Sequence, residues 1–343
     1  MKHFKYSFIF AILALIAITM WGYTQGNALR VLGITFILAI MEISFSFDNA
    51  VLNATILKTW NRYWQMMFLS LGMIIAVFGM RLLFPIIIVS QTADMSIANT
   101  WHLAITNPVS YSEHLSAHHA EISAFGGVFL LLVFLNFLFD EEKRVHWFEY
   151  VEEEISKLGK VDAISVLITL LVTLFMLSFI NGAEKQLSIL ISAIWGIIVY
   201  LSVKFIGIVL EHYQESRITK QAIKTTAQGS FGGFLYLEVL DASFSFDGVI
   251  GSFAITKDII IIMVGLGIGA FFVRSMTIYL VEKGTLDEYI YLEHGAHYAI
   301  GALAIIMLMG ITGIEVPEII TGLVGIVFIA VSLYTSIKAK KST

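Results

Sequence analysis

The sequence predicts an all-α, polytopic membrane protein of about ten transmembrane helices in two inverted-topology five-helix repeats. Three observations predict this fold: the composition, a series of long apolar stretches, and a duplicated acidic motif. Hydrophobic residues make up 58% of the 343 residues and charged residues only 14%. Soluble domains average about 25% charged residues, so this chain has too few charges to cover a surface that faces water.

Stretches long enough to cross a bilayer, which takes about 20 mostly apolar residues, occur ten times. They span roughly 6–22, 31–57, 64–90, 122–139, 162–181, 187–210, 231–256, 259–281, 296–312 and 317–336. The first stretch could instead be a signal peptide, because Lys2 and Lys5 precede it. No small-x-small cleavage site follows it cleanly, so we expect a retained helix.

The orientation follows from the 21 Lys and Arg residues, because cytoplasmic loops of membrane proteins are enriched in them. With the N-terminus inside and ten spans, fifteen of them fall in inside segments and three lie within spans. Only Arg30, Lys185 and Lys257 fall outside. A missed or invented helix would scramble this alternation, so we expect ten helices with both termini in the cytoplasm.

Two polar segments interrupt the spans. Residues 140–161, expected inside, are strongly charged. Their pattern suits a short surface or interfacial helix, although a solvated linker between the two halves of the chain is the favoured interpretation. Residues 91–121, expected outside, hold no Lys or Arg but several His and Glu residues, namely His102, Glu113, His114, His118, His119 and Glu121.

One acidic motif occurs twice. EISFSFDNAVLNATI at 42–56 and DASFSFDGVIGSFAI at 241–255 align without a gap at an offset of 199. The aligned pairs include Glu42 with Asp241, Ser44 with Ser243, Ser46 with Ser245 and Asp48 with Asp247. In each half a Gly then precedes an Arg by nine residues, and a His precedes an apolar run with a Gly. These residues are Gly72, Arg81, His119 and Gly126 in the first half and Gly265, Arg274, His294 and Gly301 in the second.

The repeat divides the chain into a first membrane half, 1–181, and a second, 182–343. Because each half has five spans, an odd number, the second crosses the bilayer in the opposite sense. Inverted repeats of this kind are the architecture of many secondary transporters, whose substrate sites lie near the midplane between the repeats. The two acidic motifs lie in the middles of their spans, as that architecture requires.

Acidic side chains inside a bilayer are expensive, at roughly 2.5–3.5 kcal/mol each when ionised. Five acids lie in the interior of the predicted spans, away from their ends, namely Glu42, Asp48, Glu238, Asp241 and Asp247. Arg81 and Arg274 can neutralise at most two. A bound divalent cation is the simplest way to neutralise the others, although any single acid could instead be one half of a structural pair with an arginine.

The candidate ligands are hard oxygen donors, which suit Mn, Ca or Mg rather than soft metals. We expect the metal site to contain Glu42, Ser46, Asp48, Asn49, Asp241, Ser245 and Asp247, with possible accessory roles for Arg81, His119, Glu238, Arg274 and His294. The bland alternative for each serine is a hydrogen bond to the carbonyl four residues back.

Helix geometry places these ligands on more than one face. Glu42, Ser46, Asn49 and Asn53 share one face of an ideal helix, and Asp48 points about 120° away. Either the motif helices are broken, or the acids line different walls of one cavity. Gly248 and Gly251 favour a break in the seventh span over one in the second.

With EISFSFDNAV and DASFSFDGVI as its acidic signatures, the chain resembles the TerC family of membrane proteins over roughly residues 31–312. The family belongs with the LysE-like exporters, and this chain looks most like a branch with longer sequences. The resemblance implies metal-ion transport, chiefly manganese export, with links to tellurite resistance. It also implies that Glu42, Asp48, Asn49, Asp241 and Asp247 hold the ion. Gly248 stands where the first motif has Asn, and additional helices flank the matched region.

The leading hypothesis is therefore a divalent-cation exporter, not an enzyme, in the bacterial inner membrane. Its partners would be the lipid bilayer and the transported ion, with no tightly bound cofactor. One alternative is an intramembrane aspartyl-type enzyme, since two transmembrane aspartates can share a proton. The Gly-x-Gly-Asp signature of such proteases is absent. Another alternative is a non-transporting scaffold in a metal or tellurite stress response.

Several other classes are excluded or unsupported. The chain has no cysteine, which rules out disulfides, thiolate metal sites and cysteine nucleophiles. A net charge of −5 gives no hint of nucleic-acid binding. The sequence contains no Walker loop, no His-Glu-x-x-His and no Gly-x-Ser-x-Gly motif. The oligomeric state has no signature in the sequence.

Overall fold

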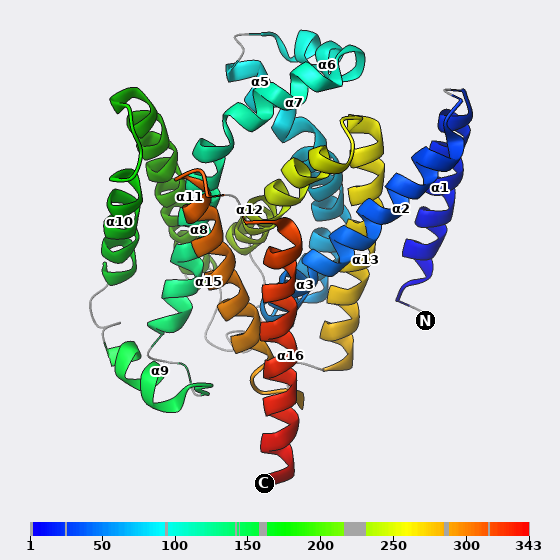
Figure 1. Cartoon of the computed structure of the whole chain (residues 1–343). Helices are drawn as coiled ribbons and strands as arrows, with labels where there is room; N and C mark the ends of the chain where they lie inside the picture. Colours follow the sequence, from blue (N-terminus) through cyan, green and yellow to red (C-terminus); the bar gives the residue numbers. More distant parts are fainter. Residues whose placement is uncertain are drawn as a thin grey trace.

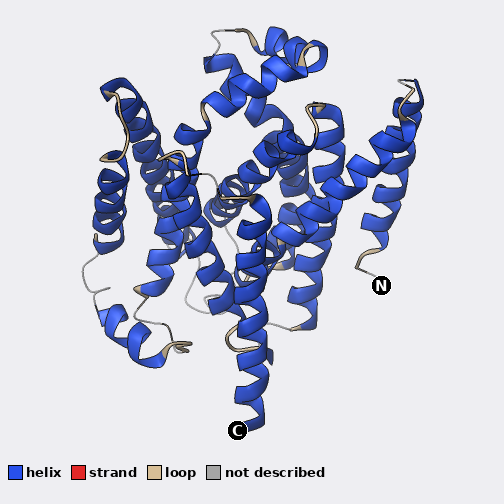
Figure 2. Cartoon of the chain, in the orientation of Figure 1, coloured by secondary structure: helices blue, strands red, loops and turns tan. Residues whose placement is uncertain are grey.

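The computed structural model describes residues 3–24, 26–92, 95–140, 143, 145–157, 163–215, 231–284, 288–314 and 316–342. Within these ranges some side chains, including those of 207–215 and 245–247, are not described. Every regular element in the described part of the chain is helical (Figure 2). The all-α prediction is therefore confirmed.

All ten apolar stretches predicted from the sequence coincide with helices (Figure 1). The elements are α1 Lys5–Thr24, α2 Ala28–Phe45, α3 Phe47–Leu57, α4 Arg62–Met67, η1 Phe68–Gly72, η2 Ile75–Leu83, α5 Phe84–Thr92, α6 Ile97–Thr106, α7 Pro108–Ala117, α8 His119–Leu138, α9 Glu149–Ser156, α10 Ile164–Leu177, α11 Ala183–Glu215, α12 Phe231–Ile255, α13 Ile259–Lys283, α15 Leu292–Gly310 and α16 Glu318–Ser342.

The helices are those of a multi-pass membrane protein. Seven spans in the described residues are long and apolar enough to cross a membrane, and the bent pair α2–α3 makes an eighth. Large apolar side chains such as Leu13, Phe36 and Trp195 are exposed on these helices, as expected where lipid replaces water. Two further helices match predicted spans but differ from the rest. α10 has only 14 residues, and the apolar sequence of α12 contains three acidic residues, although the helix is continuous.

The centre of the bundle is formed by helices from both ends of the sequence. α13 packs along α2, and α15 packs along α8. Glycines permit the first contact, because a Cβ at Gly265 would lie 2.7 Å from Leu38 Cβ and one at Gly269 only 2.4 Å from Glu42 Cβ. α1 joins this core through the Ser7 hydroxyl, which donates to the Phe271 carbonyl of α13 at 2.8 Å.

The helix break lies in the second span and not in the seventh, contrary to the sequence expectation. α2 and α3 meet at Ser46 with a bend of 49°, and Ser46 has φ −99° and ψ 19°, outside helical geometry. α12 remains helical through Gly248 and Gly251. Glycines lower the barrier to a break without causing one. In the second span, Asp48 in the first turn of α3 accepts one of the backbone N–H groups that the new helix start leaves free, as described below.

The third span has an irregular form that the sequence does not predict. Its middle is π-helical over Phe68–Gly72 and again over Ile75–Leu83. The wider turn lets Arg81 donate from Nη1 to the carbonyl of Ala76, five residues back, at 2.6 Å. Such π segments are rare and frequently occur at functional sites.

The two polar segments fold at opposite ends of the bundle (Figure 1). Residues 91–121 contribute the short helices α6 and α7 at one end. At the other end α9 docks on α15, in place of the solvated linker favoured from the sequence. Glu152 of α9 is fully buried and lies 2.9 Å from Lys143 Nζ. It also accepts from the Tyr298 hydroxyl at 2.9 Å.

Candidate cation site

The break between α2 and α3 is built around Asp48. A helix that starts inside a membrane leaves backbone N–H groups without partners. The Asp48 carboxylate accepts one of them, the N–H of Asn49, at 2.9 Å. Its other oxygen faces Gly325 of α16, where a Cβ would lie 3.1 Å away. Asp48 is buried, and no cationic side chain among the described residues pairs with it.

Glu42, one turn before the break, is paired. Arg81 Nη2 donates to Glu42 Oε1, and the Ser46 hydroxyl donates to the same oxygen at 3.0 Å. Both members of the pair are buried. The other Glu42 oxygen faces Gly248 of α12, where a Cβ would stand 3.4 Å away. The first acidic motif therefore lies against the second, as expected.

Asp241 in the second motif has the equivalent arginine. Arg274 Nη2 donates to Asp241 Oδ2 at 2.5 Å, and Asn53 Nδ2 of α3 donates to the other carboxylate oxygen at 2.9 Å. Arg274 also donates to the carbonyls of Phe68 and Gly72, at 2.9 and 3.3 Å. Asp241 is thus fully hydrogen-bonded, and Asn53 connects the two motif helices directly.

Glu238, one turn before Asp241, lacks such partners. It is 4% exposed, and its Oε1 lies 3.7 Å from Arg274 Nη2, beyond hydrogen-bond distance. Neither carboxylate oxygen has a hydrogen-bond partner. A Cβ at Gly72 would stand 2.3 Å from Glu238 Oε1, so only glycine leaves room for this side chain.

The region therefore has too many oxygen acceptors. Buried oxygens without a donor are Asn49 Oδ1, Asn53 Oδ1 and both oxygens of Glu238, against one unpartnered donor, Arg81 Nε. The formal charges agree with this, since four buried carboxylates face two guanidinium groups among the described side chains. Buried polar atoms almost always have partners. Hard cations and water are the partners that oxygen acceptors can take.

The structure distributes the predicted residues over more than one place. Glu42 and Ser46 lie with Arg81, while Asp241 lies with Arg274 and Glu238. Among the described residues no three His, Asp or Glu side chains are close enough together to hold a metal ion. The expected ligands Ser245 and Asp247 lie outside the described side chains.

The other predicted serines, and the two histidines at equivalent positions of the predicted repeats, make local contacts. Ser44 and Ser243 donate to carbonyls four residues back, at 2.8 and 3.0 Å, which is the bland alternative. His119 is at the start of α8, 3.4 Å from Ser123. His294 is at the start of α15, 2.9 Å from the Val145 carbonyl and 3.5 Å from Glu152. Neither histidine reaches the acidic motifs.

Asn53 is the site residue that the ligand prediction omitted. The signal was present, because Asn53 shares a helix face with Glu42 and Asn49 in the sequence.

Comparison with known proteins gives a family and nothing more specific. A family model described as "Protein of unknown function (DUF475)" matches residues 47–343. No curated protein matches the chain, and no solved structure does.

Proposed function

The chain belongs to the DUF475 family, and from that premise we propose that it is a membrane transporter of divalent cations. The observation that carries the proposal is the excess of buried oxygen acceptors between α3 and α12. Asn49 and Asn53 on α3 and Glu238 on α12 offer oxygens that no protein donor satisfies. A cation that passes between the two acidic motifs would satisfy them in transit.

The chemistry of these oxygens selects the class of ion. Carboxylates and amide carbonyls are ligands for Mg, Ca and Mn, and thiolates and imidazoles for softer metals are missing from this region. The likeness of the acidic motifs to those of the TerC family puts manganese first. We place Asp48, Asn49, Asn53 and Glu238 on the ion path, with Glu42 and Asp241 held by their arginines beside it.

We further propose that the two halves, 1–181 and 182–343, are inverted repeats. Two sets of equivalent contacts support this. Glu42 pairs with Arg81 as Asp241 pairs with Arg274. α2 packs along α13, and α12 packs along the η2 segment, so each motif helix lies on the arginine-bearing helix of the other half. The peripheral helices follow the repeat only in part. α1 packs on α2 as α11 packs on α12, but α1 also packs on α13 whereas α11 packs on α8.

Contacts at the two ends of the bundle support ten spans with both termini in the cytoplasm. Arg30, Pro108 and Lys257, all expected outside, line a single pocket. Lys143 and Glu152, expected inside, lie with the start of α15. α1 begins and α16 ends toward the end that holds α9 (Figure 1). We propose that the protein lies in the inner membrane of a bacterial cell, with this end of the bundle on the cytoplasmic side.

A flux assay tests the function. Purified protein in proteoliposomes should carry Mn²⁺, and to a smaller extent Mg²⁺ or Ca²⁺, down an imposed gradient. Asp48→Asn removes a buried carboxylate with no cationic partner among the described residues, and Glu238→Gln removes one that has only a 3.7 Å contact with Arg274. We expect each to reduce the initial rate at least ten-fold. Glu153→Gln, on the exposed face of α9, is the control and should transport normally.

Two outcomes would overturn the proposal. One is flux no greater than in empty liposomes for all three ions. The other is normal flux in both carboxylate variants. Peptide cleavage by the wild type that Asp48→Asn abolishes would favour the aspartyl-enzyme alternative instead.

A further inference from the structure

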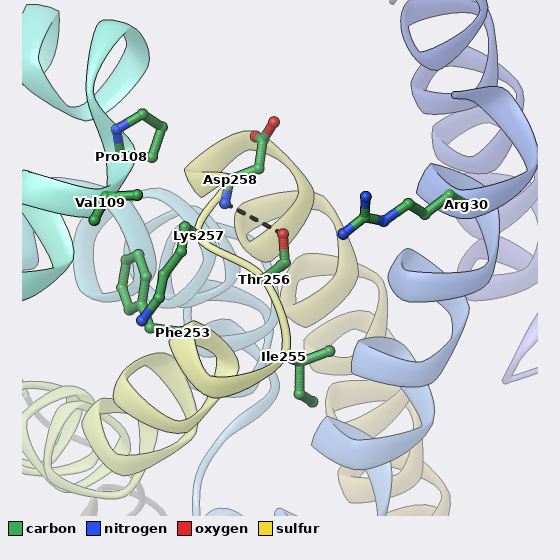
Figure 3. A pocket seen from close by; sticks show the side chains of 8 residues that line it. All are labelled: Arg30, Pro108, Val109, Phe253, Ile255, Thr256, Lys257 and Asp258. Atoms are coloured by element: carbon green, nitrogen blue, oxygen red, sulfur yellow. Dashed lines mark hydrogen bonds between the residues drawn. The ribbon is translucent and has the colours of Figure 1, made fainter. Parts of the chain in front are cut away.

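A pocket of about 390 Å³ lies at the end of the bundle that the topology places outside (Figure 3). Its walls come from the first turn of α2, the start of α7 and the turn between α12 and α13. It is far along α12 from Glu238 and Asp241 and shares no residue with the candidate cation site.

The pocket carries two basic side chains that have no acidic partner. Arg30 and Lys257 are exposed, and neither forms an ion pair with the described residues. The one acid in the wall, Asp258, caps a helix instead of pairing with either cation. Its carboxylate accepts the N–H groups of Ile260 and Ile261 at 2.9 and 3.3 Å, which caps α13.

Helix starts add to the positive potential. α2 begins at Ala28, two residues before Arg30, and α7 begins at Pro108, which itself lines the pocket. The N-terminus of a helix carries roughly half a positive charge. The start of α7 and two side-chain cations therefore line one hollow, in which Figure 3 shows the Arg30 guanidinium extending from α2 toward the α12–α13 turn.

The placement of these cations is itself unusual. Basic residues are depleted on the outer side of membrane proteins. Of the three that the topology puts outside, Arg30 and Lys257 come from different halves of the chain and meet here. Apolar side chains complete the wall, with Phe253 buried and Val109 and Ile255 exposed. The wall of the pocket thus combines two cationic side chains with apolar ones (Figure 3).

We propose that this pocket binds the phosphate of an anionic phospholipid. Two of the helix ends that form it, those of α2 and α13, belong to apolar segments long enough to cross a membrane, which puts the pocket near the depth of the lipid headgroups. A basic side chain near the membrane surface attracts an anionic headgroup by about 1 kcal/mol, or roughly five-fold in affinity. The apolar residues beside the cations give the first part of the acyl chains a surface to lie on. The site does not depend on the transport proposal.

Lipid binding to the full-length, delipidated protein in detergent tests the site. Bound phosphatidylglycerol and phosphatidylcholine are counted by native mass spectrometry as each is titrated. We expect preferential binding of phosphatidylglycerol. Arg30→Gln with Lys257→Gln should weaken it by roughly 30-fold, from the loss of two basic residues near an anionic headgroup. Lys185→Gln, an outside basic residue away from the pocket, should bind like the wild type.

The remaining arms separate a lipid from a free anion and from misfolding. Inorganic phosphate alone should neither displace phosphatidylglycerol nor raise the melting temperature. If it does both, the pocket takes a free anion and the lipid proposal is wrong. Equal phosphatidylglycerol binding by the wild type and the double variant would also overturn it. Should the double variant not fold, Lys257→Gln alone should weaken binding roughly five-fold.

Discussion

The buried acids of this chain differ in what neutralises each of them. Glu42 and Asp241 each have an arginine, and Glu152 has Lys143 and several hydrogen-bond donors. Asp48 has no counterion among the described residues, and Glu238 has only a 3.7 Å contact with Arg274, which already donates to Asp241. A buried ion pair that is well hydrogen-bonded is locked, because breaking it leaves an uncompensated charge. Under the proposed function, Asp48 and Glu238 are therefore the acids left to respond to a passing cation.

Glu152→Gln should destabilise the docked α9 segment. Burial alone would raise the pKa of Glu152, but hydrogen bonds from His294 and Lys143 hold it well below its usual value of 4.5. A carboxyl with a depressed folded pKa contributes stability above its unfolded pKa and loses it as the pH falls. We expect the variant to lose about 3 kcal/mol at neutral pH and to depend less on acid pH. Tryptophan-fluorescence melting in detergent measures both.

The matched control for this prediction is on the same helix. Glu154 pairs with Lys157, and both are exposed, so Glu154→Gln should cost less than about 0.5 kcal/mol. A melting curve in which the two variants behave alike would show that the Glu152 cluster does not hold α9 in place.

Close helix contact explains how the candidate site is assembled from distant elements. Gly265 and Gly269 face α2 one turn apart, in the Gly-x-x-x-Gly spacing that lets membrane helices approach closely. Gly269 lies directly against Glu42. The same helix carries Arg274 one turn further on, so the contact sets the separation of the two motifs as well as the packing.

Gly269→Ala should therefore act on both stability and transport. Its Cβ would be 2.4 Å from Glu42 Cβ and 3.0 Å from the Ala39 carbonyl, so α2 must move away. We expect a loss of 1–3 kcal/mol, typical of overpacking, and a fall in Mn²⁺ flux. Gly267→Ala meets only the end of the Val77 side chain at 3.3 Å and should be nearly neutral. Equal effects in melting and flux assays would contradict this account.

The positions of the helices were predicted from the sequence more successfully than the irregularities within them, such as the break at Ser46. Apolar length locates the helices, because a bilayer requires long apolar segments, and seven of them, or eight with the bent pair α2–α3, are long and apolar enough to cross a membrane among the described residues. The break at Ser46 was assigned to the wrong motif, because Gly248 indicates only flexibility, whereas Asp48 accepts a backbone N–H at the new helix start. Within the site, the paired Glu42 and Asp241 were anticipated as one of two possibilities. Whether the oxygens of Asn53 and Glu238 find a hydrogen-bond donor depends on how α13 and η1 pack against them. A local sequence pattern does not predict that packing.

At the scale of the whole molecule, the chain combines a symmetric centre with asymmetric edges. Each motif helix packs on the arginine-bearing helix of the other half, while each motif acid pairs with the arginine of its own half. α1 and α11 share only part of their contacts. A rocking motion between halves would therefore move Asp48 and Glu238 relative to each other without breaking either arginine pair. This arrangement depends on α10 and α12 crossing the membrane, and they are the two least typical spans.

Cysteine labelling tests this topology directly, because the chain has no cysteine of its own. Single substitutions Glu153→Cys, Glu184→Cys, Lys257→Cys and Glu288→Cys all fall at exposed positions. A membrane-impermeant maleimide should label positions 184 and 257 in intact cells, and 153 and 288 only after permeabilisation. If α10 does not cross, position 184 will label together with 153. If α12 does not cross, position 257 will differ from 184. Either result would invalidate the inverted repeat, because an even number of spans per half leaves the two acidic motifs parallel.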